Sequence, residues 1–237
     1  MRARHLARRC FGDCHAIPRR LGDFANRLVQ WRSAKSVRSL AQVRQTTPQR
    51  SDGDCAKPET TLPDYLAPGL DIVLVGINPG AYSVRAGHYY ARPGNRFWKA
   101  ANRAGLFGEP LEPEADARVL EFGIGLTDVV KRPTPTARDL RAADYRRWAP
   151  VLKEKVRRFQ PRIVCFQGIG SYRNYLRYGE GLSAPPRPRP GRQARALEFS
   201  VVFLVPSPSG LNTLYSFEDL VNCYRQLRAL RDEIRSA

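Results

Sequence analysis

The sequence has few cysteines and no long apolar segment. Five cysteines in 237 residues are too few for a disulfide-stapled scaffold, and they favour a reducing compartment. The apolar runs at 72–75 and 201–205 have the length of strands, far short of the roughly 20 residues of a membrane-spanning helix. We therefore expect no membrane partner. With 42% hydrophobic and 10% aromatic residues, the chain can still bury a core.

Acidic residues are much less frequent than basic residues. The chain has 22 Asp and Glu against 40 Lys and Arg, a formal net charge of +18. This balance is typical of proteins that bind nucleic acid, although a solvated basic surface or tail produces it too. Residues 1–62 carry +8 and the remainder carries +10, so both parts are basic.

Residues 1–61 are rich in arginine and lack hydrophobic periodicity, which predicts a disordered basic arm ahead of one domain at 62–237. A targeting segment or an over-extended translation start would look the same. Targeting would indicate the nucleus or a mitochondrion in a eukaryote, whereas a bacterial protein would lie in the cytoplasm or nucleoid. Cys10 and Cys14 have no second pair at metal-binding spacing, so we expect no metal there.

Strand-like and helix-like segments alternate through the predicted domain. Buried strands are predicted where apolar runs end in turn residues, at 71–76, 162–167 and 199–205, with a further apolar segment at 124–130. Helices are predicted at 96–104 behind Asn95, at 144–159 with a break or restart at Pro150, at 171–178, and from Ser216 to about Ile234 behind a Ser216/Asp219 capping box. The Pro- and Arg-rich segment 184–195 is predicted to be a surface loop. The alternation predicts an α/β fold with three layers, α/β/α, around a mostly parallel sheet.

Two loops after predicted strands are the candidate ligand sites, because ligands of parallel sheets bind beyond the carboxyl ends of the strands. The first, at 76–80, reads Gly-Ile-Asn-Pro-Gly, and Tyr90 follows with a flat aromatic face. Asn-Pro-Gly alone is ordinary turn chemistry, but after a buried strand its backbone N–H groups can face a ligand. The second, at 206–212, is stiffened by prolines and carries Leu211, an apolar tip suited to wedging between stacked bases.

Four segments together resemble one family: GINPG at 76–80, GHYYARPGNRFW at 87–98, GIGLTDVVKRPT at 123–134 and PSPSGLN at 206–212. They are similar to the mismatch-specific uracil/thymine-DNA glycosylases of the uracil-DNA glycosylase superfamily, over about 62–231. The resemblance implies that superfamily's fold and a monofunctional DNA glycosylase without a cofactor or metal. Such an enzyme flips uracil, with thymine or damaged pyrimidines as further candidates, out of a G·U or G·T mismatch in double-stranded DNA. It hydrolyses the N-glycosidic bond and leaves an abasic site. We expect a monomer.

The resemblance also implies roles for single residues. Asn78 matches the asparagine that positions the attacking water, and an amide orients water without deprotonating it. Tyr90 matches the aromatic residue that stacks on the flipped base. The backbone of Ile77 matches the group that binds the pyrimidine edge, and Ser83 faces its C5 side. The loop that fills the gap left by the base corresponds to Ser209, Gly210, Leu211 and Asn212.

The remaining inferences concern charged residues and alternative functions. Lys131 and Arg132 are predicted phosphate contacts, with solvated charge as the alternative. The fast uracil-specific branch carries Asp in its first loop and His at the position of Val205, so their absence favours the mismatch branch; Asp128 stands where relatives have Asn or Lys.

A nucleic-acid-binding protein of the same fold without activity stays an alternative. An iron–sulfur glycosylase is disfavoured because the cysteines do not cluster, and Cys165 and Cys223 are predicted to be packing residues.

Overall fold

The computed structural model of the protein describes residues 60–185 and 188–237. The predicted basic arm at 1–61 lies outside the described residues except for its last two positions, and so do Cys10 and Cys14. The domain boundary at residue 62 stays a prediction. Within the described part of the chain, no helix combines the length and apolar character needed to cross a membrane.

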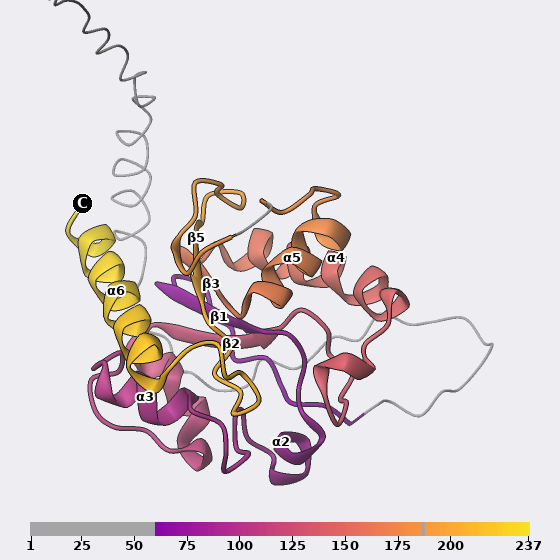
Figure 1. Ribbon diagram of the computed structural model, residues 1–237. Coiled ribbons are helices and arrows are strands. Elements are labelled where there is room, and N and C mark those ends of the chain that lie inside the picture. Colours follow the sequence, from indigo (N-terminus) through magenta and orange to yellow (C-terminus); the bar gives the residue numbers. More distant parts are fainter. Residues whose placement is uncertain (1–59, 186–187) are drawn as a thin grey trace, which may run out of the picture. The chain divides into compact units, whose positions relative to one another are not determined.

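A five-stranded sheet with the strand order β2-β1-β3-β5-β4 forms the centre of the domain (Figure 1). The strands are β1 (Ile72–Gly76), β2 (Ile124–Asp128), β3 (Ile163–Gln167), β4 (Gly191–Arg192) and β5 (Val201–Val205). All pairs are parallel except β4 with β5. The predicted α/β fold with a mostly parallel sheet is therefore confirmed. The short edge strand β4 corrects the prediction that 184–195 is only a loop, because two of its residues pair with β5.

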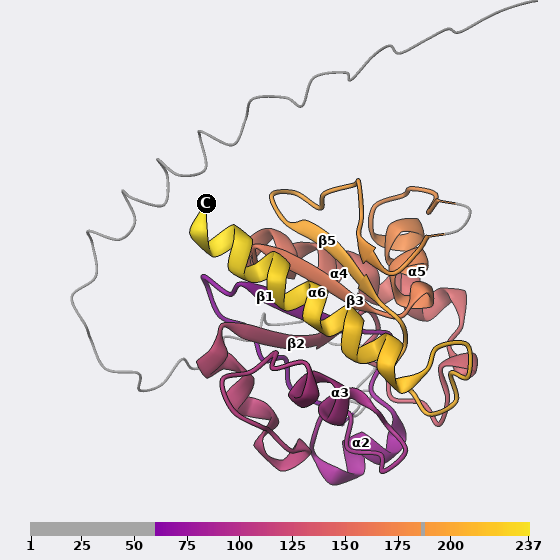
Figure 2. The same cartoon turned by 60° about the vertical axis from the view of Figure 1, so that its left-hand side comes forward.

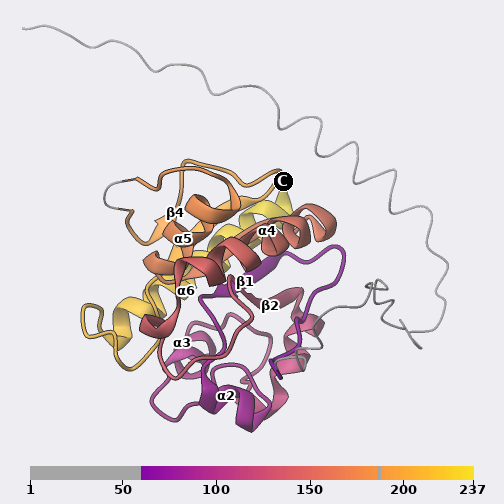
Figure 3. The same ribbon diagram turned by 90° about the vertical axis from the view of Figure 1, so that its right-hand side faces the viewer.

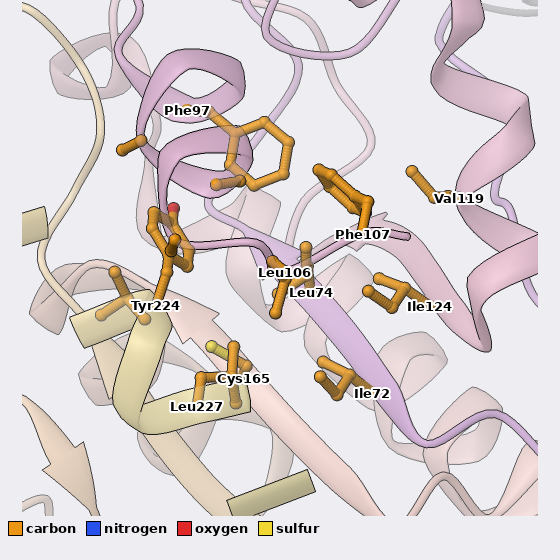
Figure 4. Close-up of a cluster of buried hydrophobic side chains, with 14 of the residues drawn as sticks. Ile72, Leu74, Phe97, Leu106, Phe107, Val119, Ile124, Cys165, Tyr224 and Leu227 are labelled. Atoms are coloured by element: carbon orange, nitrogen blue, oxygen red, sulfur yellow. The ribbon is translucent and has the colours of Figure 1, made fainter. Parts of the chain in front are cut away.

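Alternate residues of β1, β3 and β5 enter two separate cores, which is why these strands read as continuous apolar runs. Ile72 and Leu74 of β1 pack with α3 (Phe97–Arg103) and α6 (Phe217–Ser236) on one face (Figures 2 and 4). Val73 and Val75 pack with α4 (Ala142–Phe159) and α5 (Ile169–Gly179) on the other (Figure 3). The helices thus cover both faces and complete the three layers.

The ends of the helices follow local signals closely. In α6 the capping box is formed, since Asp219 N donates to Ser216 Oγ at 3.1 Å and Ser216 N donates to Asp219 Oδ2 at 2.8 Å. At α3 the side chain of Asn95 accepts from Phe97 N at 2.9 Å, but the helix begins at Phe97 with Arg96 at the N-cap, one residue later than predicted. Cys165 of β3 and Cys223 of α6 are buried in the same core, so the prediction that they are packing residues is confirmed.

The predicted break or restart at Pro150 is wrong, because α4 runs from Ala142 to Phe159 with Pro150 inside it. A proline removes one helical hydrogen bond and crowds the preceding turn. Pro150 is exposed, whereas its neighbours Ala149 and Leu152 are buried against the sheet. Water can therefore bind the carbonyl group that loses its partner, and packing on the buried side holds the helix together.

Replacing the capping serine tests the start of α6. We expect Ser216→Ala to lower the free energy of unfolding by about 1 kcal/mol, because the N–H of Asp219 loses its acceptor. Ser236→Ala is the matched control, since that hydroxyl bonds only to Asp232 O near the end of the same helix. Urea denaturation of both variants measures the difference, and equal stabilities would contradict the role given to the cap.

Candidate active site

The carboxyl ends of β1, β2 and β3 open onto a cavity of about 520 Å³. Their last residues, Gly76, Asp128 and Gln167, line it together with parts of both predicted loops. The chain passes from β1 to β2 on one side and then crosses to β3 on the other side of β1. Parallel sheets bind ligands at such a crossover, and the volume suits a small organic group.

A second cavity, of about 350 Å³, lies beside α6 near Gly123, at the amino end of β2. Its arginines already have acidic partners: Arg228 and Arg231 pair with Asp232, and Arg235 pairs with Asp71. We therefore place the candidate site at the first cavity.

The amide of Asn78 has a fixed orientation. Its Nδ2 donates to Pro79 O at 3.2 Å, to Arg132 O at 3.1 Å and to Thr134 Oγ1 at 2.6 Å. Thr134 Oγ1 in turn donates to Thr136 O at 2.7 Å, so it can only accept from Asn78. Because the two carbonyls and this hydroxyl all act as acceptors, the amide nitrogen of Asn78 must face them. The Oδ1 atom of Asn78, which lines the cavity with its residue, is thereby left to accept a hydrogen bond from a ligand or water.

Tyr90 lines the cavity from a strained backbone position. Its φ is +56°, in the left-handed region that bulky residues rarely adopt and that costs roughly 1–2 kcal/mol. Its ring packs against Phe97 of α3 with 4.2 Å between centroids. Its hydroxyl is buried without a hydrogen-bond partner. Such strain clusters at ligand-binding positions, where the surroundings hold the residue in place.

Asp116 provides that hold. This buried carboxylate from the 3₁₀ helix η1 (Pro113–Phe122) accepts from Tyr89 N at 2.7 Å and from Tyr65 OH at 3.0 Å, and it lies 3.3 Å from His88 Nδ1. On the other side of the segment, Trp98 Nε1 donates to Tyr89 O at 2.9 Å. Both peptide groups of Tyr89, the residue before Tyr90, are therefore held by side chains. Burial, together with the nearby Asp116 charge, raises the pKa of Tyr65 to about 12.

Asp128 places a carboxyl group at the floor of the cavity. It is 3% exposed, and its Oδ2 has no hydrogen bond. A β-carbon at Gly76 would collide with its Oδ1, so the glycine makes room for this side chain. Burial raises the pKa of Asp128 to about 6, and Lys131, 3.8 Å away, opposes that rise. The group therefore changes charge just below neutral pH.

Lys131 does not face solvent, and this corrects the prediction that it contacts DNA. It is 5% exposed, and its Nζ donates to Asp64 Oδ1 and to Tyr89 OH, both at 3.0 Å. Burial by itself opposes the charge of Asp64, yet Lys131 and Lys155 lower the pKa of that carboxyl. Lys131 thus neutralises buried carboxylates beneath the cavity.

Arg96 fixes the second loop to the wall of the cavity. Its guanidinium donates to Tyr215 O at 2.9 Å and to Asn212 O at 2.8 Å, and its backbone N donates to Pro208 O at 2.9 Å. Gly210 of this loop lies so close to Gly94 that a β-carbon on Gly210 would be 2.5 Å from Gly94 O. Leu211, by contrast, is 70% exposed and lies at the cavity mouth. The loop is rigid at its base and apolar at its tip.

A sequence model of the uracil DNA glycosylase superfamily matches residues 63–228, which include all the residues that line the cavity except Leu62. The chain belongs to this superfamily. It is also similar to the solution NMR structure of a candidate uracil DNA glycosylase from Methanosarcina acetivorans. The two share 25% sequence identity and a TM-score of 0.48, over 73% of this chain and 98% of the other.

Membership of the uracil DNA glycosylase superfamily supports a DNA glycosylase that acts as a hydrolase. Of the residues to which the resemblance gave roles, those that line the cavity are Ile77, Asn78, Ser83, Tyr90, Ser209, Leu211 and Asn212, whereas Gly210 lies against Gly94 and is not part of the lining. Their roles stay predictions. The guanidinium of Arg132 binds Asp144 at 2.7 Å, and its contact with a phosphate also stays a prediction. In the described ranges, no three His, Cys, Asp or Glu side chains gather as a metal site would require.

Sequence reasoning missed several residues that shape this cavity. Thr134 lies in the motif at 123–134, so it could have been predicted from the sequence as a polar residue of the site. Asp116 gave none, because its partners at 65 and 88–89 are distant in sequence. Tyr82, Arg92 and Arg138 also line the cavity and are exposed, which makes them available to a ligand.

The shifted carboxyl of Asp128 predicts a pH-dependent stability. The folded state holds its proton up to about pH 6, whereas the unfolded chain releases it near 3.8, so rising pH between these values destabilises the wild type. Asp128→Asn removes this slope. We expect its free energy of unfolding, relative to wild type, to increase by about 2 kcal/mol between pH 4 and pH 7.

Urea titrations at several pH values measure this difference. Glu114→Gln, at an exposed carboxyl of η1, is the control and should show no such trend. A constant difference between Asp128→Asn and wild type across the range would contradict the buried, protonatable carboxyl.

Proposed function

We propose that the protein is a monofunctional mismatch-specific uracil/thymine-DNA glycosylase. On this proposal it binds double-stranded DNA as a monomer, flips uracil or thymine out of a G·U or G·T mismatch, and leaves an abasic site. The observation that carries the proposal is the fixed amide of Asn78, whose Oδ1 is the free end in a cavity lined by Tyr90. An enzyme that acts on a base must first extrude it from the stack into such a pocket.

The reaction breaks the bond between C1′ of the sugar and N1 of the pyrimidine. The electron pair leaves with the base, and positive charge develops on the sugar. A water molecule whose hydrogen is held by Asn78 Oδ1 adds to C1′ and loses a proton, which gives a free pyrimidine and an abasic sugar. Asn78 orients this water but cannot take its proton. The carboxylate of Asp128 lines the same cavity and is ionised above about pH 6, so it is our candidate acceptor and stabilises the positive sugar.

The remaining residues of the cavity recognise the base in this proposal. Tyr90 presents a ring backed by Phe97, suited to stacking on a pyrimidine. Backbone groups at Ile77 bind the edge of the base. Ser83, 7% exposed at the wall, faces C5 and bears on whether the methyl group of thymine is accepted.

Duplex DNA contacts the rim of the cavity on this proposal. Leu211 enters the gap left by the flipped base, while Ser209, Gly210 and Asn212 face the opposite strand. The exposed Arg92 and Arg138 approach phosphates on either side of the mouth, which sequence reasoning did not predict. These contacts make the binding depend on salt, because each neutralised phosphate releases counterions.

Removing the amide of Asn78 tests the mechanism. Purified wild type should release free uracil from a G·U duplex in the presence of EDTA. We expect Asn78→Ala to lower the single-turnover rate by about 10²- to 10³-fold, the usual effect of losing one polar group that stabilises the transition state. Its affinity for the duplex should stay within about threefold, because the rim contacts are unchanged.

Asn222→Ala, at an exposed position of α6, is the matched control and should keep the wild-type rate. Full activity of Asn78→Ala would overturn the assigned mechanism. DNA binding by wild type with no release at stoichiometric enzyme would favour the alternative of a nucleic-acid-binding protein of the same fold. A panel of G·U, A·U, G·T and single-stranded uracil substrates tests the mismatch preference.

A further inference from the structure

Exposed hydrophobic side chains lie at and near the mouth of the cavity. In the described part of the chain, five large hydrophobic side chains are exposed, and three of them lie in or close to the two loops of the site. Tyr82, at 43% exposure, and Leu211, at 70%, line the cavity, and Leu214, at 87%, follows Leu211 by three residues. Single exposed apolar residues are ordinary, but a group beside a cavity indicates a surface that contacts a ligand.

Tyr82 differs from the other two because it is flat, aromatic and next to a cation. It lies in the first turn of α2 (Ala81–Ala86), which directly follows the Asn78 loop, and it lines the cavity. The guanidinium of Arg85 lies 5.9 Å from the centre of its ring. An exposed ring beside a basic side chain is the combination with which proteins hold single-stranded nucleic acid, where bases stack and phosphates pair.

α2 and the loop after β5 lie at the same end of the sheet (Figure 1), and Tyr82 and Leu211 both line one cavity. A nucleotide inside that cavity is joined through one phosphate to each neighbour on its own strand, so those neighbours must lie over the rim. The charges near the rim suit this occupant, since the exposed Arg92 and Arg138 line the cavity and the exposed Arg85 lies beside Tyr82.

We infer that Tyr82, assisted by Arg85, is a stacking platform for the base next to the flipped nucleotide on the same strand. This inference rests on the proposed function and extends it to single-stranded DNA. Leu211 fills a gap that exists only in a duplex, whereas Tyr82 holds the strand that carries the target. The protein therefore binds uracil in single-stranded DNA through Tyr82, without needing the opposite strand.

Binding of an uncleavable oligonucleotide tests the platform. The probe is a single strand that carries one 2′-fluoroarabino-uracil, in which the fluorine disfavours positive charge on the sugar and so prevents release. We expect Tyr82→Ala to weaken binding by about tenfold, as removal of one stacking contact does. Tyr82→Phe keeps the ring and should bind within about twofold of wild type. Phe199→Ala, an exposed aromatic ahead of β5 at the opposite edge of the sheet, is the control and should bind like wild type.

A second probe replaces both neighbours of the target by abasic analogues. Wild type should then lose its tenfold advantage over Tyr82→Ala, because no base is left to stack. In a duplex probe, Leu211→Ala should weaken binding more than Tyr82→Ala does, and in the single strand the order should reverse.

Equal binding of Tyr82→Ala and wild type to the single strand would overturn the inference, and so would an advantage that persists with abasic neighbours. These results are separate from the test of the proposed function, because binding of this probe needs no cleavage. If wild type releases uracil while Tyr82→Ala binds normally, only the platform is wrong. If wild type releases no uracil while the tenfold loss is found, only the glycosylase activity is wrong.

Discussion

Parallel pairing of β1 along both of its edges is the constraint on which the site depends. β2 and β3 run beside β1 in the same direction, so Gly76 lies opposite Asp128 and Val75 opposite Phe166. Helices cover both faces of the sheet, and the polar groups of the strand ends can therefore meet a ligand only at this edge. The chain must leave the sheet at these strand ends. The backbone arrangement alone therefore brings the loops that carry Asn78 and Leu211 to one cavity.

Beneath that cavity, charge is balanced among buried groups. Asp64 binds Lys131, Lys155 and the hydroxyl of Thr127, so its negative charge is fully matched. Asp128 is attracted by Lys131, at 3.8 Å, and by Lys155, but its Oδ2 is without a hydrogen bond. The network thus leaves this less closely matched carboxyl where a ligand enters. Buried ion pairs add little net stability, and here their arrangement serves to fix where that charge lies.

The sheet and the helix ends could be predicted because their causes are local. Apolar runs with covered faces identify β1, β3 and β5, and the Ser216 and Asp219 pair identifies the start of α6. The outcome at Pro150 depended on which side of α4 faces water, and sequence spacing alone does not decide that. Lys131 looked like a surface cation because its partner Asp64 is 67 positions earlier. Asp116 was missed for the same reason. The residues that line the cavity could be predicted only from the four sequence motifs together, because no single motif is specific enough to identify the site.

The close approach of Gly76 to Asp128 means that these two positions cannot change independently. Any side chain at 76 meets the carboxylate oxygen, so a larger residue is accepted there only after residue 128 has become smaller or has turned away. The order of substitutions then matters. A smaller residue can be introduced at position 128 first, whereas a larger residue at position 76 is not accepted while Asp128 is present. An effort to change the base preference by altering the cavity floor must therefore treat the two strand ends as one unit, and their effects on stability will not add.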